Sequence, residues 1–580
     1  MRPFRRRLAF VSALVVAAGS ACGGGTDSDS GQDGDGGSGT AGSSTTAGTG
    51  GSSDAGDDGV DGETGEPTAA PSGELVFSPP GGIYTDTVAV EISADMPGAI
   101  HFSVDGSLPT DASPVYDAAI PLSETTQIRA LFVADTGETD AASAPYIFAS
   151  DALTASTNLP IVVVETWGSL DEINDPERPR DRHLVHSVLI EPNGGTAGFD
   201  TPPSFAGRGG MHIRGNSTTD YPKKQWSLEL WKEDDSGKNV ALLGLPKESD
   251  WVLHAPYSDK SLMRNYLMYT WSNRIGRYAA KTEFVEVWVD DDGLLEPDDY
   301  VGVYEFMEKV KVDEGRVSID KLGPKDNALP QLSGGYLLQR DWLGEPGEQW
   351  LTTDTYGDEI LFKSPKPDAL TDAQRGYITD YMNAFEAALA DPGFADTVTG
   401  YAAFIDVDSF IDHHLLVEMG RNVDGYVLST YMHKGREGLL NMGPIWDYNG
   451  ALGNASYFDC ELPEGWHFDN DAFPADNPNG YHWYARLFED PAFVERYQAR
   501  WRELRRGPLS TANMLSDIDA AAARLNGAGA VERNFERWPV LGEDVWPNDP
   551  GAVDRVSYAE EIDYLQTWLT ARVTWMDSQL

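Results

Sequence analysis

The sequence predicts an α+β protein with two folded parts, a small N-terminal β-sandwich and a much larger mixed domain. Between 73 and 150, short β-rich runs alternate with Pro, Gly, Asp and Ser turns. From 155 to 580, strand and helix patterns mix, and the helical patterns gather towards the C-terminal half. With 580 residues, of which 41% are hydrophobic, the chain is long enough for two or more packed domains.

The first 22 residues have the pattern of an export signal. Four arginines among the first seven residues precede an apolar run at 8–18, which is too short to span a bilayer. The segment 19–22, Gly-Ser-Ala-Cys, resembles a bacterial lipobox, although Gly19 stands where a larger apolar residue is usual. This resemblance implies that Cys22 is acylated and becomes the new N-terminus. An ordinary secretory signal that contains a cysteine is the alternative.

Residues 23–72 are predicted to be a disordered linker. They are rich in Gly, Ser, Thr, Asp and Ala and contain no Lys or Arg, so they cannot bury enough surface to offset their ordering entropy. A lipid anchor followed by such a spacer suits a domain held at a membrane, facing the periplasm or the cell exterior. No later run of some 18 apolar residues predicts a second membrane contact.

The overall charge argues against nucleic acid as a partner. Against 43 Lys and Arg there are 93 Asp and Glu, which gives a formal net charge of −50. Such a field repels polyanions and suits solubility and divalent cations.

Short β-rich runs at 88–92, 100–104 and 127–133 predict the sandwich. The segments 77–82, FSPPGG, and 101–109, HFSVDGSLP, together with 128–130, resemble the immunoglobulin-like module at the C-terminus of chitobiases and β-hexosaminidases. In that family the module has no catalytic residues, so the resemblance does not imply hydrolase activity. A glycan-binding role and a spacer role both stay open.

The large domain contains runs that predict regular elements. Strands are expected at 284–289, 336–338 and 360–362, and helices at 409–422 and 562–576, where apolar residues recur at helical spacing.

Two clusters in this domain have features of a phosphate site. Residues 211–228 predict a strand, a Gly/Ser turn and a second strand with paired lysines, Lys223 and Lys224. Backbone N–H groups at Arg214, Gly215, Asn216 and Ser217 could cradle phosphate oxygens, which one of the lysines would neutralise. In the second cluster, 300–310, Glu308 could orient that lysine. The alternatives are a plain basic hairpin and an exposed charge at the end of a strand.

The third cluster contains two aspartates in the order found in phosphoryl-transfer sites. Asp424 follows the predicted helix, and Asp447 lies in the Gly-bounded segment 443–453 after a strand-like stretch. In such sites one carboxylate accepts or orients the proton of the nucleophile, and the other holds the metal that bridges phosphate oxygens. The alternative for Asp447 is a residue that caps a turn.

Together these clusters resemble the CotH family of spore-coat-H-like atypical kinases. The motifs that carry the resemblance are 214–217, 222–224, 242–246, 250–253, 263–265, 300–309, 422–424 and 445–448. The resemblance implies a kinase-like fold that binds ATP with Mg²⁺ or Mn²⁺ and phosphorylates Ser or Thr on surface or secreted proteins. It implies a catalytic role for Asp424 and metal binding by Asp447. Asn449 stands where the family often has Asp, which removes one negative charge and weakens the attraction for a metal.

Two other classes of protein are compatible with the sequence. The export signal, the linker, the sandwich and Asn449 also suit a non-catalytic surface scaffold or adhesin that keeps the kinase-like shape. The 16 tryptophans and many carboxylates suit glycan binding or cleavage, but no segment indicates the close carboxyl pair that a retaining glycosidase needs.

Overall fold

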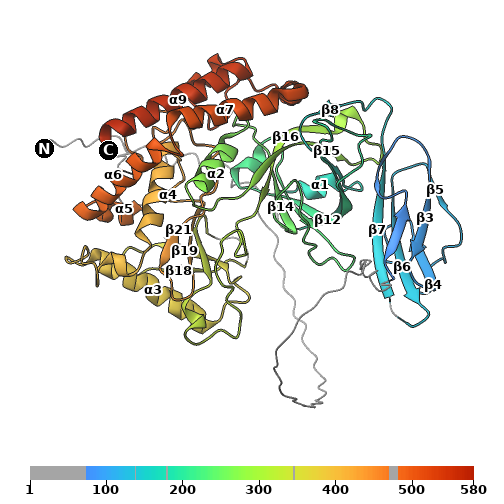
Figure 1. The fold of residues 1–580 in the computed structure, drawn as a ribbon, viewed down its shortest axis with the longest axis horizontal. Coiled ribbons are helices and arrows are strands. Elements are labelled where there is room, and N and C mark those ends of the chain that lie inside the picture. Colours follow the sequence, from blue (N-terminus) through green and yellow to red (C-terminus); the bar gives the residue numbers. More distant parts are fainter. Residues whose placement is uncertain (1–72, 138, 178–180, 344–346, 469–480) are drawn as a thin grey trace, which may run out of the picture. The chain divides into compact units, whose positions relative to one another are not determined.

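Two β-sheets form the N-terminal domain of the computed structural model, which describes residues 73–137, 139–177, 181–343, 347–468 and 481–580. The predicted signal peptide and linker, 1–22 and 23–72, lie outside these residues. One sheet has the order β1-β3-β5 and the other β2-β7-β6-β4, and their inner faces share one apolar core. Figure 1 shows β3 and β5 beside β7, β6 and β4. The strands are β1 (Leu75–Ser78), β2 (Gly82–Tyr84), β3 (Val88–Ala94), β4 (Gly98–Ser103), β5 (Ile120–Leu122), β6 (Thr126–Ala134) and β7 (Thr139–Phe148).

The larger domain begins with a closed barrel of seven strands in the order β10-β12-β13-β14-β16-β15-β9. Its strands are β9 (Ile161–Glu165), β10 (His183–Ile190), β12 (Phe205–Ile213), β13 (Trp226–Leu230), β14 (Asp250–His254), β15 (Thr282–Asp290) and β16 (Tyr300–Glu308). Alternate residues of a strand face opposite sides. Trp226 and Leu228 therefore share one apolar core with Tyr304 and Phe306, whereas Val303 and Met307 join the core of the remaining elements.

A second sheet and a set of helices complete the larger domain. The sheet has the order β18-β19-β17-β20-β21, with β17 (Tyr336–Arg340), β18 (Trp350–Thr352), β19 (Glu359–Ser364), β20 (Thr430–Lys434) and β21 (Leu440–Met442). The helices are α1 (Leu170–Ile173), α2 (Arg264–Arg274), α3 (Asp372–Ala390), α4 (Val407–Gly420), α5 (Tyr481–Leu487), α6 (Pro491–Arg506), α7 (Thr511–Asn526), α8 (Ala530–Arg537) and α9 (Tyr558–Gln579). A two-stranded sheet pairs β8 (Ser156–Thr157) with β11 (Ala197–Gly198).

Helix boundaries follow local capping chemistry. The Thr371 and Ser557 side chains start α3 and α9, each in a capping box that pairs two otherwise unbonded backbone N–H groups. Asp406 caps α4 by accepting from the Ser409 N–H, and Arg421 ends this helix with φ at 47°. The turn that follows α4 contains Asp424, so the end of α4 sets the position of that carboxylate.

The structure confirms the α+β class and corrects three details of the prediction. The helix expected at 409–422 ends at Gly420, which places Asn422 in the following turn. Lys223 and Lys224 precede β13 and are not part of it. The barrel itself was not expected, because its closure depends on the parallel pairing of β9 with β15, more than 100 residues away.

Candidate functional site

The turn between β12 and β13 begins with Arg214 and Gly215. Gly215 has a φ of +99°, and a Cβ there would lie 2.0 Å from Thr218 Oγ1 and 2.4 Å from Gln225 Nε2. Only glycine fits this position, because both the backbone angle and the space exclude a side chain. Asn216 and Ser217 are exposed on the turn, and the 3₁₀ helix η1 (Ser217–Asp220) follows.

The two lysines have different surroundings. Lys223 is buried, and its Nζ donates to the Val303 carbonyl at 2.7 Å and to Asn534 Oδ1 at 2.8 Å. Burial lowers the pKa of Lys223 to about 7. Lys223 therefore links β16 to α8. Lys224 stays with the turn, since its Nζ donates to the Thr219 carbonyl at 2.6 Å.

Glu308 has an arginine as its partner where a lysine was expected. Its carboxylate lies 3.0 Å from Arg316 Nε and accepts from the Lys281 N–H at 3.0 Å. It is fully buried, so it is not an exposed charge at the end of a strand either. The carboxylate near Lys223 is Glu305, whose pKa burial raises to about 8, helped by repulsion from Asp259. Positions 305 and 308 lie on opposite faces of β16, which explains why only Glu305 faces α2.

Three half-buried carboxylates come together at the predicted catalytic and metal positions. Asp424 follows α4, Asp447 follows β21, and Asp341 follows β17. Burial and repulsion by Asp447 and then Asp341 raise the pKa of Asp424 to about 7. Burial and repulsion by Asp447 also raise the pKa of Asp341 to about 6. Mutual repulsion of this kind indicates a site that a cation would stabilise.

Arg214 is the basic side chain whose charge acts on Asp447. Burial raises the pKa of Asp447, and the Arg214 guanidinium opposes that rise. The same guanidinium lies 5.7 Å from the centre of the Trp446 ring. The structure thus brings together Arg214 of the turn and Asp447, whereas Lys223 has partners on β16 and α8 and Lys224 bonds to a carbonyl of the turn.

The backbone at Asp447 is held in a conformation that costs energy. Its φ of +63° lies in the left-handed region, which is unfavourable by about 1–2 kcal/mol for a residue with a side chain. The Asp447 N–H donates to Tyr269 Oη at 3.0 Å, and Asn422 Nδ2 donates to the Asp447 carbonyl at 3.2 Å. The next N–H, of Tyr448, donates to Asn265 Oδ1 at 2.7 Å. These contacts fix the backbone from which the Asp447 carboxylate projects.

The site offers oxygen donors to a divalent cation. Asp447 and Asn449 are half-buried neighbours, and Asn454 Nδ2 holds the Asn449 carbonyl at 2.8 Å. Within the described residues, no three His, Cys, Asp or Glu side chains form a metal-ligand set. The donors present fit Mg²⁺ or Mn²⁺ in the way that Mg²⁺ usually binds, through one or two carboxylates together with substrate phosphates and water.

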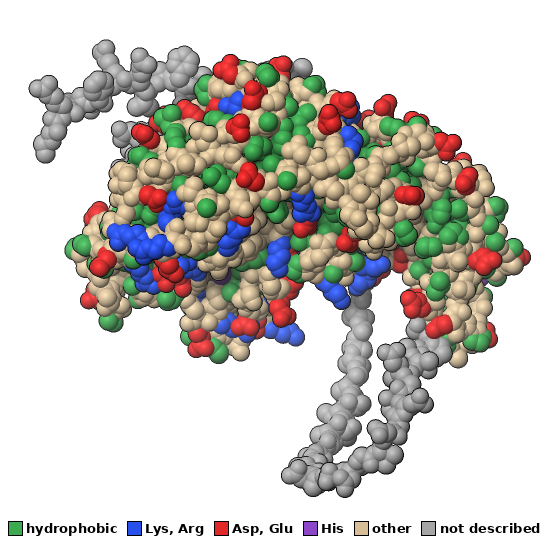
Figure 2. Space-filling view, turned by 45° about the horizontal axis from the view of Figure 1, so that its top comes forward, with side chains coloured by type: hydrophobic (Ala, Val, Ile, Leu, Met, Phe, Trp, Pro, Cys, Tyr) green, Lys and Arg blue, Asp and Glu red, His purple; other side chains and the backbone are tan. Residues whose placement is uncertain are grey.

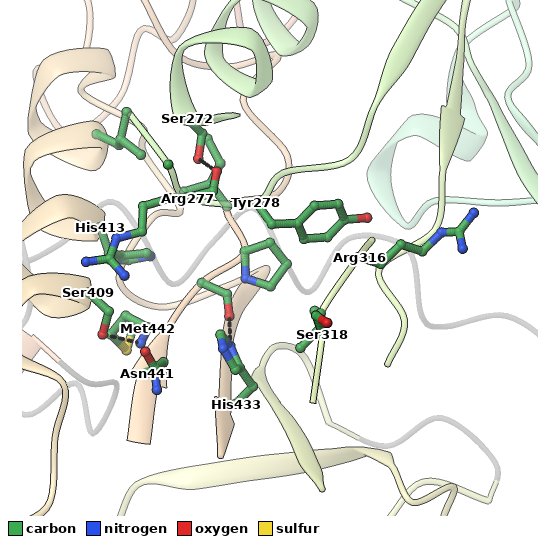
Figure 3. A pocket seen from close by; sticks show the side chains of 16 residues that line it. Ser272, Arg277, Tyr278, Arg316, Ser318, Ser409, His413, His433, Asn441 and Met442 are labelled. Atoms are coloured by element: carbon green, nitrogen blue, oxygen red, sulfur yellow. Dashed lines mark hydrogen bonds between the residues drawn. The ribbon is translucent and has the colours of Figure 1, made fainter. Parts of the chain in front are cut away.

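A cavity of about 150 Å³ lies along the segment that leads to Asp447. Its lining includes Gly443, Pro444 and Ile445, and none of the three carboxylates belongs to it. Figure 3 shows two hydrogen bonds that fix this wall. His433 Nδ1 lies 3.0 Å from the Gly443 carbonyl, and the Met442 N–H donates to Ser409 Oγ at 3.1 Å. The cavity is therefore separate from the acidic site, although both share the 443–447 segment.

Four residues of this site were missed from the sequence. Asn265 and Tyr269 of α2 hold the Asp447 segment, and Asn265 does lie in the 263–265 motif that carried the resemblance. His254 ends β14 next to Asn265. No sequence feature marked Asp341 as a site residue, because a single acidic residue after a short strand is common.

The surface gives two further facts. On the face drawn in Figure 2, acidic side chains are spread widely and do not gather in one patch. Among the described residues, no helix is long and apolar enough to cross a membrane.

Comparison with known families assigns the two domains. The family model described as CotH kinase protein matches residues 211–576, and the model described as chitobiase/beta-hexosaminidase C-terminal domain matches residues 79–144. The first match covers more than half of the chain and every predicted site residue from Arg214 to Asn449. The chain therefore belongs to the CotH kinase protein family, with a chitobiase-type domain before the kinase-type one. No curated protein matches it.

Proposed function

We propose that this chain is an exported, lipid-anchored CotH-like protein kinase that phosphorylates Ser or Thr on surface or secreted proteins. The observation that carries the proposal is the convergence of Asp424, Asp447 and Arg214, which come from three distant segments of the chain. Two carboxylates and one guanidinium in this arrangement match the needs of phosphoryl transfer in a kinase-like fold.

Each residue has a role that follows from its surroundings. Asp424 accepts the proton of the substrate hydroxyl, and a pKa of about 7 suits a base that works near neutral pH. Arg214 donates to phosphate oxygens from the end of β12. Asp447 and Asn449 hold Mg²⁺ or Mn²⁺ through their oxygens, and ATP supplies the group that is transferred. Lys224 is the better candidate for a lysine that contacts phosphate, because Lys223 already links β16 to α8.

A transfer assay with labelled ATP, Mn²⁺ and a generic protein acceptor tests the proposal. Asp424→Asn keeps the shape of the side chain but cannot accept a proton, so we expect transfer to fall by at least about 100-fold. The exposed Asp111 of the sandwich offers a matched control, and Asp111→Asn should transfer at the parent rate. Equal activity in the parent and in Asp424→Asn would remove Asp424 from the mechanism.

Asn449 favours one alternative, a non-catalytic surface scaffold. An amide at this position removes a negative charge from the metal site and weakens metal binding. If the scaffold role is correct, no transfer occurs in any variant. Restoring the charge with Asn449→Asp separates the two functions, because an active kinase should gain metal affinity, whereas a scaffold should stay inactive.

The sandwich is better suited to act as a spacer than as a glycan platform. Among its described residues the large hydrophobic side chains with high exposure are Val76, Val104, Leu108 and Val115, and none of these is aromatic. Glycan sites in proteins usually present exposed aromatic rings, which favours the spacer role. We therefore expect the protein substrate to contact the larger domain.

A further inference from the structure

A chain of hydrogen bonds connects the Gly215 turn to the Asp447 segment across three elements. Gln225 Nε2, just before β13, donates to Thr218 Oγ1 in the turn. Gln225 Oε1 lies 3.0 Å from Nδ1 of His254, at the end of β14. His254 Nε2 lies 3.1 Å from Nδ2 of Asn265, in the first turn of α2. Asn265 Oδ1 accepts the Tyr448 N–H at 2.7 Å.

The direction of every link follows from the last one. Because the Tyr448 N–H can only donate, Asn265 Oδ1 accepts and Asn265 Nδ2 must donate to His254 Nε2. His254 then carries its proton on Nδ1 and donates to Gln225 Oε1, which leaves Gln225 Nε2 to donate to Thr218. The chain requires a neutral imidazole, and burial, with the nearby charge of Arg214, lowers the pKa of His254 to about 3. One tautomer and one orientation of each amide satisfy all four links.

The middle of this chain is shielded from water. Gln225, His254 and Asn265 are 6%, 7% and 2% exposed. A donor or acceptor left without its partner here would be costly, so the residues must keep or lose their arrangement together. The neighbouring Glu305 carboxylate accepts from the Tyr266 N–H at 3.0 Å, which holds α2 against β16 beside the chain.

We propose that His254 and Asn265 are positioning residues that couple the Gly215 turn to the Asp447 segment. Through them, the order of the turn and the backbone conformation of the Asp447 segment depend on each other, so that the phosphate side and the metal side of the site form together. This inference rests on the proposed function for its role in phosphoryl transfer, but the coupling itself is a property of the chain alone.

Amide hydrogen exchange on the full chain without nucleotide tests the coupling. Thr218→Val removes the hydroxyl at the turn and leaves the side chains of Gln225, His254 and Asn265 unaltered. We expect amide exchange in the segment 445–449 to accelerate by about two- to tenfold, the effect of one hydrogen bond, while α9 stays unchanged. Thr218→Ser keeps the hydroxyl and should restore the parent rate. Unchanged exchange at 445–449 in Thr218→Val would overturn the proposal.

A double-mutant cycle excludes a general loss of stability. His254→Phe keeps an aromatic ring but has no nitrogen, so it breaks the middle of the hydrogen-bond chain. Asn265→Leu breaks the same part of the chain if the first variant does not fold. In either background Thr218→Val should have no further effect at 445–449, because the connection is already broken. Additive effects would show that turn and segment are independent.

Titration of the same variants with Mn²⁺ and ATP separates this inference from the proposed function. If the parent chain binds nucleotide, Thr218→Val should weaken Mn²⁺ binding in the presence of ATP by about two- to tenfold, and only when His254 is intact. If the parent binds no nucleotide but the exchange effects appear, the coupling stands and the kinase function falls. Nucleotide binding without coupled exchange would support the nucleotide site and overturn the coupling.

Discussion

At the scale of single residues, two things decide which charged side chains belong to the site: the face of the strand on which a residue lies, and the group to which its side chain bonds. Glu305 and Glu308 are both acids of β16, yet only Glu305 faces α2, and Glu308 pairs with Arg316. The sequence places a lysine pair next to a Gly/Ser turn, but it does not say which amine is already used by a carbonyl. Arg214 was predicted from the turn, and its effect on Asp447 is what the structure adds.

Asn534 provides a test of the structural role of Lys223. Asn534 Oδ1 accepts from both Lys223 Nζ and the Val303 N–H, at 2.8 and 3.0 Å. Asn534→Ala removes the acceptor of the buried Val303 N–H and one of the two acceptors of Lys223 Nζ, so the free energy of unfolding should fall by about 1–3 kcal/mol. Chemical denaturation measures this change. Asn526→Ala, at an exposed position of α7, is the control and should change little. Equal stability of both variants would contradict the assignment of Lys223 as a link between β16 and α8.

At the scale of elements, the sequence predicts those parts whose signals are local. The strands predicted at 88–92, 284–289 and 360–362 agree within a few residues with β3, β15 and β19, and the predicted C-terminal helix is α9. Barrel closure and the position of Asp341 could not be predicted, because both depend on pairings between distant strands. The same holds for the link from His254 to Asn265, which joins β14 to α2.

The seam that closes the barrel contains two buried carboxylates in register. Glu165 of β9 pairs with Asp290 of β15, and their two buried carboxyl groups form a hydrogen bond with each other. Burial and repulsion by Asp290 raise the pKa of Glu165 to about 9. The folded chain therefore holds a proton that the unfolded chain loses above about pH 4.5, and stability from this group is lost as the pH rises from there to about 9.

Glu165→Gln should remove this pH dependence. The new amide keeps the oxygen that accepts the Trp167 N–H and can donate to Asp290. We expect the variant to gain stability over the parent with rising pH, by at most about 1.4 kcal/mol per pH unit between pH 5 and pH 9. Thermal unfolding at pH 5, 7 and 9 measures it, with the exposed Glu172→Gln as control. Parallel curves for parent and variant would show that Glu165 is ionised in the folded chain.

At the scale of the whole molecule, the proposed architecture is an anchor, a spacer, a sandwich and a kinase-type domain. The last two agree with the family matches at 79–144 and 211–576. The anchor and the spacer rest on sequence pattern alone, since 1–72 lies outside the described residues.

The predicted lipid anchor depends on the thiol of Cys22. In a bacterial host, Cys22→Ser removes the thiol that acylation requires, so the chain should move from the membrane fraction to the soluble exported fraction. Fractionation with an antibody to the chain measures this, and metabolic labelling with a fatty-acid analogue should mark the parent but not the variant. Cys460→Ser is the control, because that thiol is buried in the larger domain. Membrane association of Cys22→Ser would contradict the lipid anchor.

The proposed kinase function requires that Arg214, Asp424 and Asp447 form a working nucleotide and metal site. A thermal-shift titration of the purified chain with ATP, with and without Mn²⁺, tests it most directly. We expect stabilisation that needs both ligands, about 2.7 kcal/mol at 100 times the Kd. It should be lost in Asp447→Ala and kept in Asp111→Ala. A melting temperature that does not change at saturating ATP and Mn²⁺, or the same shift in Asp447→Ala, would contradict it.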